Sequence, residues 1–217
     1  MLWLRLAVAA LICVALPEVS GAGGANSIGT ATAVSGTVTV TRIAAGPQPL
    51  KLGDTMYWGD VVEVPKNGFA RLLLWGGTTV SVRELSRVEL QRELRTDGVR
   101  YTLELVWGKL RVSVARMLMR QDEHVDVQTR NAVASVRGTD FVVETLEPSG
   151  QAQGFGFLGA SAVREMETVV TTLSGLVEVS NRPPGTGRVE RVRALETLRV
   201  RGSHDPVRLH MRVEDLK

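Results

Sequence analysis

The feature that most constrains the fold of this chain is the alternation of apolar and polar residues over short runs. The clearest runs are residues 34–41, where valine and glycine alternate with serine and threonine, and residues 207–213, where apolar residues alternate with arginine and histidine. A period of two residues is typical of a strand with one buried face. Helical periodicity is confined to residues 131–136 and 160–167. The 32 valines and 18 threonines favour strands as well, so the sequence predicts an all-β protein.

Turn residues between these runs indicate how the strands are connected. Asp97-Gly98 lies between two alternating runs and predicts a hairpin. A Gly-x-apolar-x-Val pattern recurs at Gly36, Gly108 and Gly175, at intervals of 72 and 67 residues. Each copy predicts a glycine bend that leads into a strand. Such a repeat favours a β-sandwich or a short β-coil resembling a solenoid.

The first 22 residues have the pattern of a secretory signal peptide. Arg5 precedes an apolar run, residues 6–16, and the small residues up to Ala22 suit cleavage. The run of 11 residues is shorter than the roughly 20 that span a bilayer, although an uncleaved anchor is the alternative. Cys13 is the only cysteine and lies inside the run, so we expect neither an internal disulfide nor lipid attachment. These features predict an exported, periplasmic protein without a later membrane span.

Residues that commonly carry catalysis or bind metals form no recognisable site. His124, His204 and His210 lack the spacing of a zinc site, and the chain contains no Gly-x-Ser-x-Gly nucleophile motif. Residues 154–159 match the dinucleotide-binding pattern Gly-x-Gly-x-x-Gly by letter, but no strand–helix unit surrounds them. We therefore expect no enzymatic activity, no cofactor and no metal. No aromatic residue follows Phe157 to stack on bases, so nucleic acid is not an expected partner either.

Five segments, in this order along the chain, resemble the FecR domain. They are Val34-Ser35-Gly36-Thr37-Val38, Leu50-Lys51-Leu52-Gly53-Asp54, Trp58-Gly59-Asp60-Val61-Val62, Ala70-Arg71-Leu72 to Gly77-Thr78, and Val136-Arg137-Gly138-Thr139-Asp140-Phe141. The last segment is the most specific, and the resemblance covers roughly residues 32–180. It implies an extracytoplasmic β-rich domain. The namesake of the family relays the occupancy of a siderophore receptor to a cytoplasmic sigma factor, but only five residues precede the apolar run here. The resemblance therefore implies the envelope-side domain alone.

The motif from Arg137 to Phe141 suits a structural role. Gly138 allows a positive φ, and Phe141 suits the core. Thr139 lies between Gly138 and Asp140. Arg137 and Asp140 can pair with each other or bind nearby backbone groups. On this interpretation Arg137→Ala lowers the stability of the fold. The alternative is that Arg137 recognises a partner, because arginine is common at interfaces.

Two Gly-Asp pairs, Gly53-Asp54 and Gly59-Asp60, invite comparison with calcium sites. They lack the dense acidic spacing of a calcium loop, and Gly-Asp is common in turns. We interpret both pairs as turns.

Two segments are candidate surfaces. Residues 147–167 interrupt the family pattern and carry Phe155, Phe157 and Leu158, which predicts either a flap packed on the domain or a partner-binding loop. Residues 182–217 contain nine basic residues against five acidic ones, with Arg199, Arg201, Arg208 and Arg212 on the polar sides of predicted strands. This excess is interpreted as a solvated face or as a surface for anionic envelope polymers, lipid head groups or an acidic protein.

The predicted organisation is a signal peptide over residues 1–22, a FecR-like β domain over residues 27–181, and a basic C-terminal β segment over residues 182–217 packed on that domain. We expect an exported, non-enzymatic protein that acts as a binding or signalling-accessory module of the bacterial envelope, with a protein partner. The alternative is a structural or glycan-associated envelope protein that binds an anionic polysaccharide through its basic C-terminal strands.

Overall fold

A computed structural model describes residues 27–43, 45–95, 98–115, 117, 123–146, 166–182, 188–202, 204 and 206–209. The predicted signal peptide lies outside this part of the chain, as do residues 160–165 of the second predicted helical stretch.

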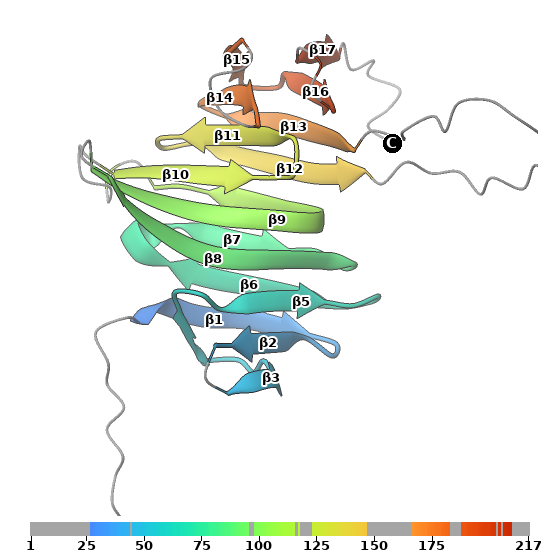
Figure 1. Cartoon of the computed structure of the whole chain (residues 1–217). Helices are drawn as coiled ribbons and strands as arrows, with labels where there is room; N and C mark the ends of the chain where they lie inside the picture. Colours follow the sequence, from blue (N-terminus) through green and yellow to red (C-terminus); the bar gives the residue numbers. More distant parts are fainter. Residues whose placement is uncertain are drawn as a thin grey trace, which may run out of the picture.

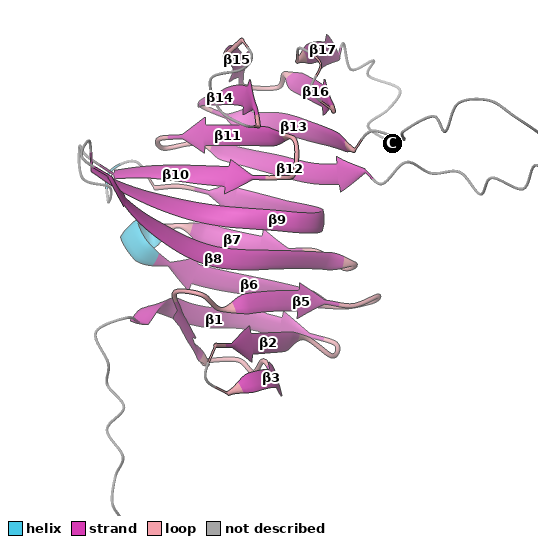
Figure 2. Ribbon diagram, in the orientation of Figure 1, coloured by secondary structure: helices cyan, strands magenta, loops and turns pink. Residues whose placement is uncertain are grey.

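Strands dominate the described residues, which contain one short 3-10 helix and no α-helix (Figure 2). The elements are β1 Ser27–Ser35, β2 Thr39–Arg42, β3 Gly46–Pro49, β4 Thr55–Tyr57, β5 Val61–Val64, β6 Phe69–Leu74, η1 Trp75–Gly77, β7 Thr79–Val82, β8 Ser86–Arg95, β9 Gly98–Ser113, β10 Glu123–Gln128, β11 Ala132–Val136, β12 Asp140–Leu146, β13 Glu167–Ser174, β14 Leu176–Asn181, β15 Glu190–Arg193, β16 Thr197–Arg201 and β17 Val207–Leu209. The predicted all-β fold is confirmed. The predicted hairpin is confirmed too, because β8 and β9 pair antiparallel from Arg95 opposite Gly98 onward.

The strands form one continuous sheet that is folded into two facing layers (Figure 1). Layer A has the order β4-β1-β6-β7-β9-β12-β13-β16-β17, and layer B has the order β3-β2-β5-β8-β9-β10-β11-β14-β15. The first part of β9 pairs with β8 and β10 in layer B, and its last part pairs with β7 and β12 in layer A. The fold therefore combines the two predicted alternatives. It has the two layers of a sandwich, and its chain passes repeatedly between them as in a β-coil.

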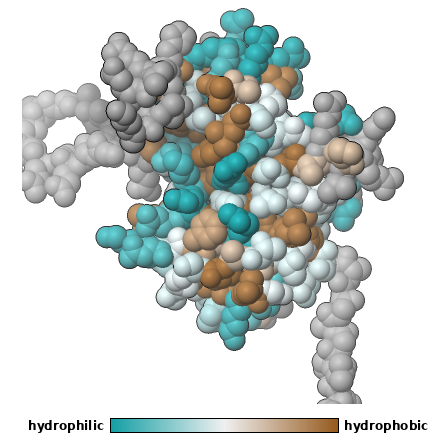
Figure 3. Space-filling model, turned by 180° about the vertical axis from the view of Figure 1, so that it is seen from behind, coloured by the Kyte–Doolittle hydropathy of each residue, from teal (hydrophilic) through white to brown (hydrophobic). Residues whose placement is uncertain are grey.

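The inward faces of the two layers share one apolar core. In β6, Ala70 and Leu72 are fully buried while Arg71 and Leu73 between and beside them are exposed, and in β12 Phe141 and Val143 are fully buried. Burying each of the larger side chains stabilises the fold by roughly 1.5–3 kcal/mol. On the outer face in Figure 3 the hydrophobic residues lie in separate patches between hydrophilic ones. The contact between the layers is therefore the main source of stability.

The three glycines of the predicted repeat lie where the chain changes layer. Gly36 connects β1 to β2, Gly108 divides β9, and Gly175 connects β13 to β14, with φ of 74°, 96° and 85°. These values are open to glycine and strained for other residues. The predicted glycine bends are confirmed. The alternating run of residues 34–41 is nevertheless two strands, because it is divided at Gly36.

The helical turn predicted for residues 131–136 is not formed. The residues form a strand that follows a polar cluster around Asn131. Residues 132–136 form strand β11 instead, because they pair on both sides with β10 and β14. The side-chain amide of Asn131 donates to the carbonyls of Met166 and Val200 in layer A, and its oxygen accepts from Thr168 at 2.6 Å. A stretch of six residues cannot be assigned to helix or strand by its period alone, so the pairing with neighbouring strands decided its structure.

Carboxylates stabilise two of the turns that connect the layers. Asp54 accepts a hydrogen bond from the backbone N–H of Lys51 at 2.8 Å, and Asp60 accepts one from Tyr57 at 2.9 Å. Asp60 is buried, and its carboxylate lies 3.8 Å from the guanidinium of Arg42. Burial raises the pKa of Asp60, while the Tyr57 N–H and Arg42 act in the opposite direction.

Replacement of Gly108 tests whether the layer change in β9 requires glycine. Gly108→Ala should lower the free energy of unfolding by more than the ~1–2 kcal/mol that a positive φ costs, because the added methyl group also overlaps Ser86 and the Leu85 carbonyl. Gly53→Ala is the matched control, since Gly53 has φ of 85° and no atom lies within 4 Å of the position that an added methyl group would take. Urea unfolding measures both losses. Equal losses in the two variants would contradict a steric role for Gly108.

The pH dependence of stability tests the environment of Asp60. Because the folded state raises its pKa above 3.8, the folded protein holds this proton more tightly than the unfolded chain does. The wild type should therefore lose stability relative to Asp60→Asn as the pH rises through the interval just above that value. The free energy of unfolding of Asp60→Ala should be ~0.5–1.5 kcal/mol lower than that of Asp60→Asn, since alanine cannot accept the Tyr57 N–H. Urea unfolding between about pH 3 and pH 7 measures this, and a wild type that gains stability relative to Asp60→Asn as the pH rises over the interval would contradict it.

Candidate partner-binding surface

The Arg-Gly-Thr-Asp-Phe motif forms the corner between β11 in layer B and β12 in layer A. Gly138 has φ of 76°, which permits the sharp change of layer. Thr139 is buried, and its hydroxyl donates to the carbonyl of Leu176 at 2.9 Å, while its own carbonyl accepts from the N–H of Val114. Phe141 is fully buried in the core. These three motif residues hold the corner against the strands beside it.

The two charged residues of the motif have different surroundings. Asp140 binds the guanidinium of Arg111 on β9 through both oxygens, at 2.9 Å and 2.5 Å. This carboxylate raises the pKa of Arg111. Arg137 does not pair with Asp140. It is exposed, and within the described residues it has no hydrogen-bond or ion-pair partner. Of the five motif residues, Arg137 is thus the one whose side chain the fold leaves free.

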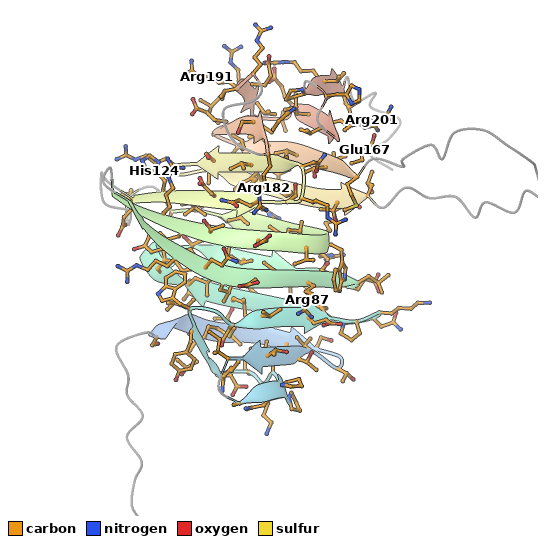
Figure 4. All side chains as sticks on the ribbon, viewed as in Figure 1. Arg87, His124, Glu167, Arg182, Arg191 and Arg201 are labelled. Atoms are coloured by element: carbon orange, nitrogen blue, oxygen red, sulfur yellow. The ribbon has the colours of Figure 1, made fainter. Side chains whose placement is uncertain are left out.

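A surface hollow of about 400 Å³ adjoins Arg137. Its lining is formed by His124, Ser135, Val136, Arg137, Gly138, Gly175, Leu176 and Glu178. His124, labelled in Figure 4, marks this end of the strands, and Arg201 and Glu167 mark the opposite end. Glu178 already binds Arg191 at 3.0 Å. The free cation and the exposed Leu176 therefore define the chemistry of the hollow.

The next corner along the edge of the sheet adds a second arginine and a second leucine. Arg193 lies opposite Leu176 in the pairing of β14 with β15, and Leu195 follows two residues later. Leu176 is 41% exposed and Leu195 is 80% exposed, and Arg193 is exposed without an ion pair among the described residues. We call Arg137, Leu176, Arg193 and Leu195 the Arg137 surface. It joins the free cation of Arg137 and the guanidinium of Arg193, whose charge helps to lower the pKa of Glu196, with two exposed apolar side chains.

Sequence reasoning did not identify Leu176, Arg193 or Leu195 as site residues. The available signal was Leu176, an apolar residue at an outward position of a strand whose other outward positions carry Glu178 and Ser180. Leu195 is exposed at a corner where its own φ is 65°. This corner contains no glycine, so the sequence does not indicate it.

The predicted basic surface is largely neutralised inside the molecule. Arg199 and Arg201 both bind Glu167, the former at 3.4 Å. Arg208 binds Glu196 at 2.9 Å and Glu190 at 3.6 Å. Contact with the Arg193 N–H and with Arg208 lowers the pKa of the exposed Glu196. Arg212 and the predicted loop residues Phe155, Phe157 and Leu158 lie outside the described residues.

The Gly53-Asp54 and Gly59-Asp60 pairs lie in turns between the layers, away from the Arg137 surface. In the described part of the chain, no three His, Cys, Asp or Glu side chains are grouped so that they could hold a metal ion. No helix among those residues has the length and apolar character needed to cross a membrane.

Comparison with solved structures finds partial likenesses. Among solved structures, a candidate anti-sigma factor from Parabacteroides distasonis ATCC 8503, solved at 1.65 Å and 2.50 Å, is 20% identical with a TM-score of 0.49. The match covers 72% of this chain and 62% of that one, so this chain spans less than two thirds of that protein. A cell surface anchoring domain is 36% identical over 30% of this chain and 84% of its own, with a TM-score of 0.28. Neither likeness carries an argument about function.

The sequence comparison is more decisive. No curated protein matches the chain. The model of the family described as FecR protein matches residues 60–178, which is more than half of the 217 residues and includes the Arg137–Phe141 corner. The chain belongs to the FecR family.

Proposed function

We propose that this chain is an exported, non-catalytic binding module of the bacterial envelope, and that it binds a partner protein through the Arg137 surface. The strongest support is the difference in contacts among the residues of the family motif. Gly138, Thr139, Asp140 and Phe141 are all engaged in the corner, whereas Arg137 is exposed and free of partners among the described residues. A charged side chain that the fold does not use is available for recognition.

The chemistry of the surface indicates the kind of partner. Arg137 has no carboxylate partner within the described chain, and Arg193 has no ion pair there, although its charge attracts the Glu196 carboxylate. Leu176 and Leu195 are exposed as well. Two arginines that offer planar donors suit carboxylates, and the leucines suit apolar side chains. The partner surface therefore carries acidic groups together with apolar ones.

The alternative of an anionic polymer on the C-terminal strands receives less support. Such a polymer needs a row of cations, but Arg199, Arg201 and Arg208 are shared with Glu167, Glu190 and Glu196. A polymer would have to displace these ion pairs. The Arg137 surface requires no such displacement.

Capture of the partner from the envelope tests the proposal. The tagged wild type should retain a stoichiometric protein that resists high salt, because apolar contacts contribute to the complex. Replacing both Arg137 and Arg193 by alanine should weaken the complex by about tenfold for each arginine, or roughly 1.4 kcal/mol each. Quantitative mass spectrometry of the captured protein measures the loss, and circular dichroism checks that the variants are folded.

Arg92 and Arg130 provide a matched control, since both are exposed and have no ion pair among the described residues. Their double replacement by alanine removes the same charge and should leave capture unchanged. Equal loss in the two double variants would show a nonspecific charge effect and would contradict the proposal. Retention of a polymer that salt releases would support the alternative instead.

A further inference from the structure

A second and larger hollow lies at the opposite end of the strands from the Arg137 surface. Its volume is about 750 Å³, within the range of ligand sites. The lining residues are Arg83, Glu84, Leu85, Trp107, Gly108, Lys109, Arg111, Val142, Glu144 and Thr145. They come from the corner between β7 and β8, from the layer change in β9 and from β12. Arg87, labelled at this end in Figure 4, lies beside the hollow on β8. We call it the Trp107 hollow.

Leu85 has an unusual conformation in this hollow. Its φ is 53°, which is rare for a large side chain, and its side chain is 60% exposed. The neighbouring residue explains how the strained turn is held. The Ser86 hydroxyl accepts from the backbone N–H of Lys109 at 2.9 Å and lies 3.2 Å from the carbonyls of Glu84 and Lys109. The structure therefore fixes an exposed leucine in a conformation that asparagine or glycine would adopt more easily.

Trp107 continues the apolar surface from Leu85. It is 36% exposed, and the guanidinium of Arg87 lies 5.6 Å from its ring centre while also binding Glu63 at 2.7 Å. This stacking orients the ring at the edge of the hollow. Leu85, Trp107 and the half-buried Val142 together offer aliphatic and aromatic contacts to a ligand.

The charges around the hollow are almost all paired. Lys109 binds Glu144 at 3.0 Å, and Arg111 binds Asp140 as described above. Glu84 accepts the backbone N–H of Asn67 at 2.7 Å but has no ion pair among the described residues. Arg83 is exposed and has no carboxylate partner in the described ranges. A ligand that leaves the existing pairs intact must therefore bring one anionic group for Arg83 and an apolar group for Leu85 and Trp107.

We infer that the Trp107 hollow binds an extended peptide segment of a partner protein, with a carboxylate side chain close in sequence to a large apolar one. The carboxylate pairs with Arg83, and the apolar side chain packs on Leu85 and Trp107. A polyanion fits less well, because one unpaired cation is available and the rest of the contact is apolar. This surface is distinct from the Arg137 surface, because the two hollows share no lining residue.

Selection from a random phage-displayed peptide library on the full chain tests this inference. Enriched peptides should carry Asp or Glu within about three positions of an aromatic or large aliphatic residue. Their affinity, measured by fluorescence polarisation, should fall at least tenfold for Leu85→Asn and for Arg83→Gln. Arg92→Gln removes an exposed arginine far along β8 and should bind like the wild type.

Thermal unfolding separates binding from packing. Asparagine tolerates a positive φ, so Leu85→Asn should raise the unfolding midpoint by roughly 2–4 °C while it loses binding. A lowered midpoint would assign Leu85 to packing and would overturn the inference. So would the absence of any enriched peptide, equal binding by all variants, or full competition by polyglutamate, which lacks apolar groups.

Discussion

The fold depends on the ability of the chain to change layer within a few residues. Each described corner between the layers contains a residue with positive φ, and in β9 a single glycine, Gly108, carries one strand from layer B into layer A. A side chain at this position would overlap Ser86 and the Leu85 carbonyl. Because β9 pairs in both layers, its bend sets the register of β8 and β10 on one side and of β7 and β12 on the other. The apolar core then follows from the alternation within each strand.

The corners also determine which side chains remain available to a partner. At the β11–β12 corner, Thr139 and Asp140 bind Leu176 and Arg111, so these motif residues are engaged within the domain. Arg137 points to solvent at the same corner. At the opposite end, the β7–β8 corner holds Leu85 exposed. The two proposed binding surfaces, at the two ends of the strands, thus arise from the same turns that build the fold.

Much of the fold follows from sequence pattern, whereas the surface does not. The alternation of valine with polar residues predicts strands, and the repeated glycines predict the corners at Gly36, Gly108 and Gly175. The period could not decide residues 131–136, because a short apolar run suits a strand or a helix until its neighbours are placed. The strand register also decides which acids face Arg199, Arg201 and Arg208, so their neutralisation could not be predicted from composition. In the same way, Arg137 has no ion pair with Asp140 because Asp140 binds Arg111 instead. Arg111 lies 26 residues before Arg137, on β9, so this pairing depends on the strand register.

The central claim is that the corner motif is structural except at Arg137, contrary to the stability role that its sequence suggests. Free energies of urea unfolding for single alanine variants across the motif test this most directly. Arg137→Ala should stay within about 0.5 kcal/mol of the wild type, as surface substitutions do. Thr139→Ala should lose ~1–3 kcal/mol with its buried hydrogen bond, and Phe141→Ala ~3–5 kcal/mol with its core packing. A loss at Arg137 as large as that at Thr139 would contradict the account.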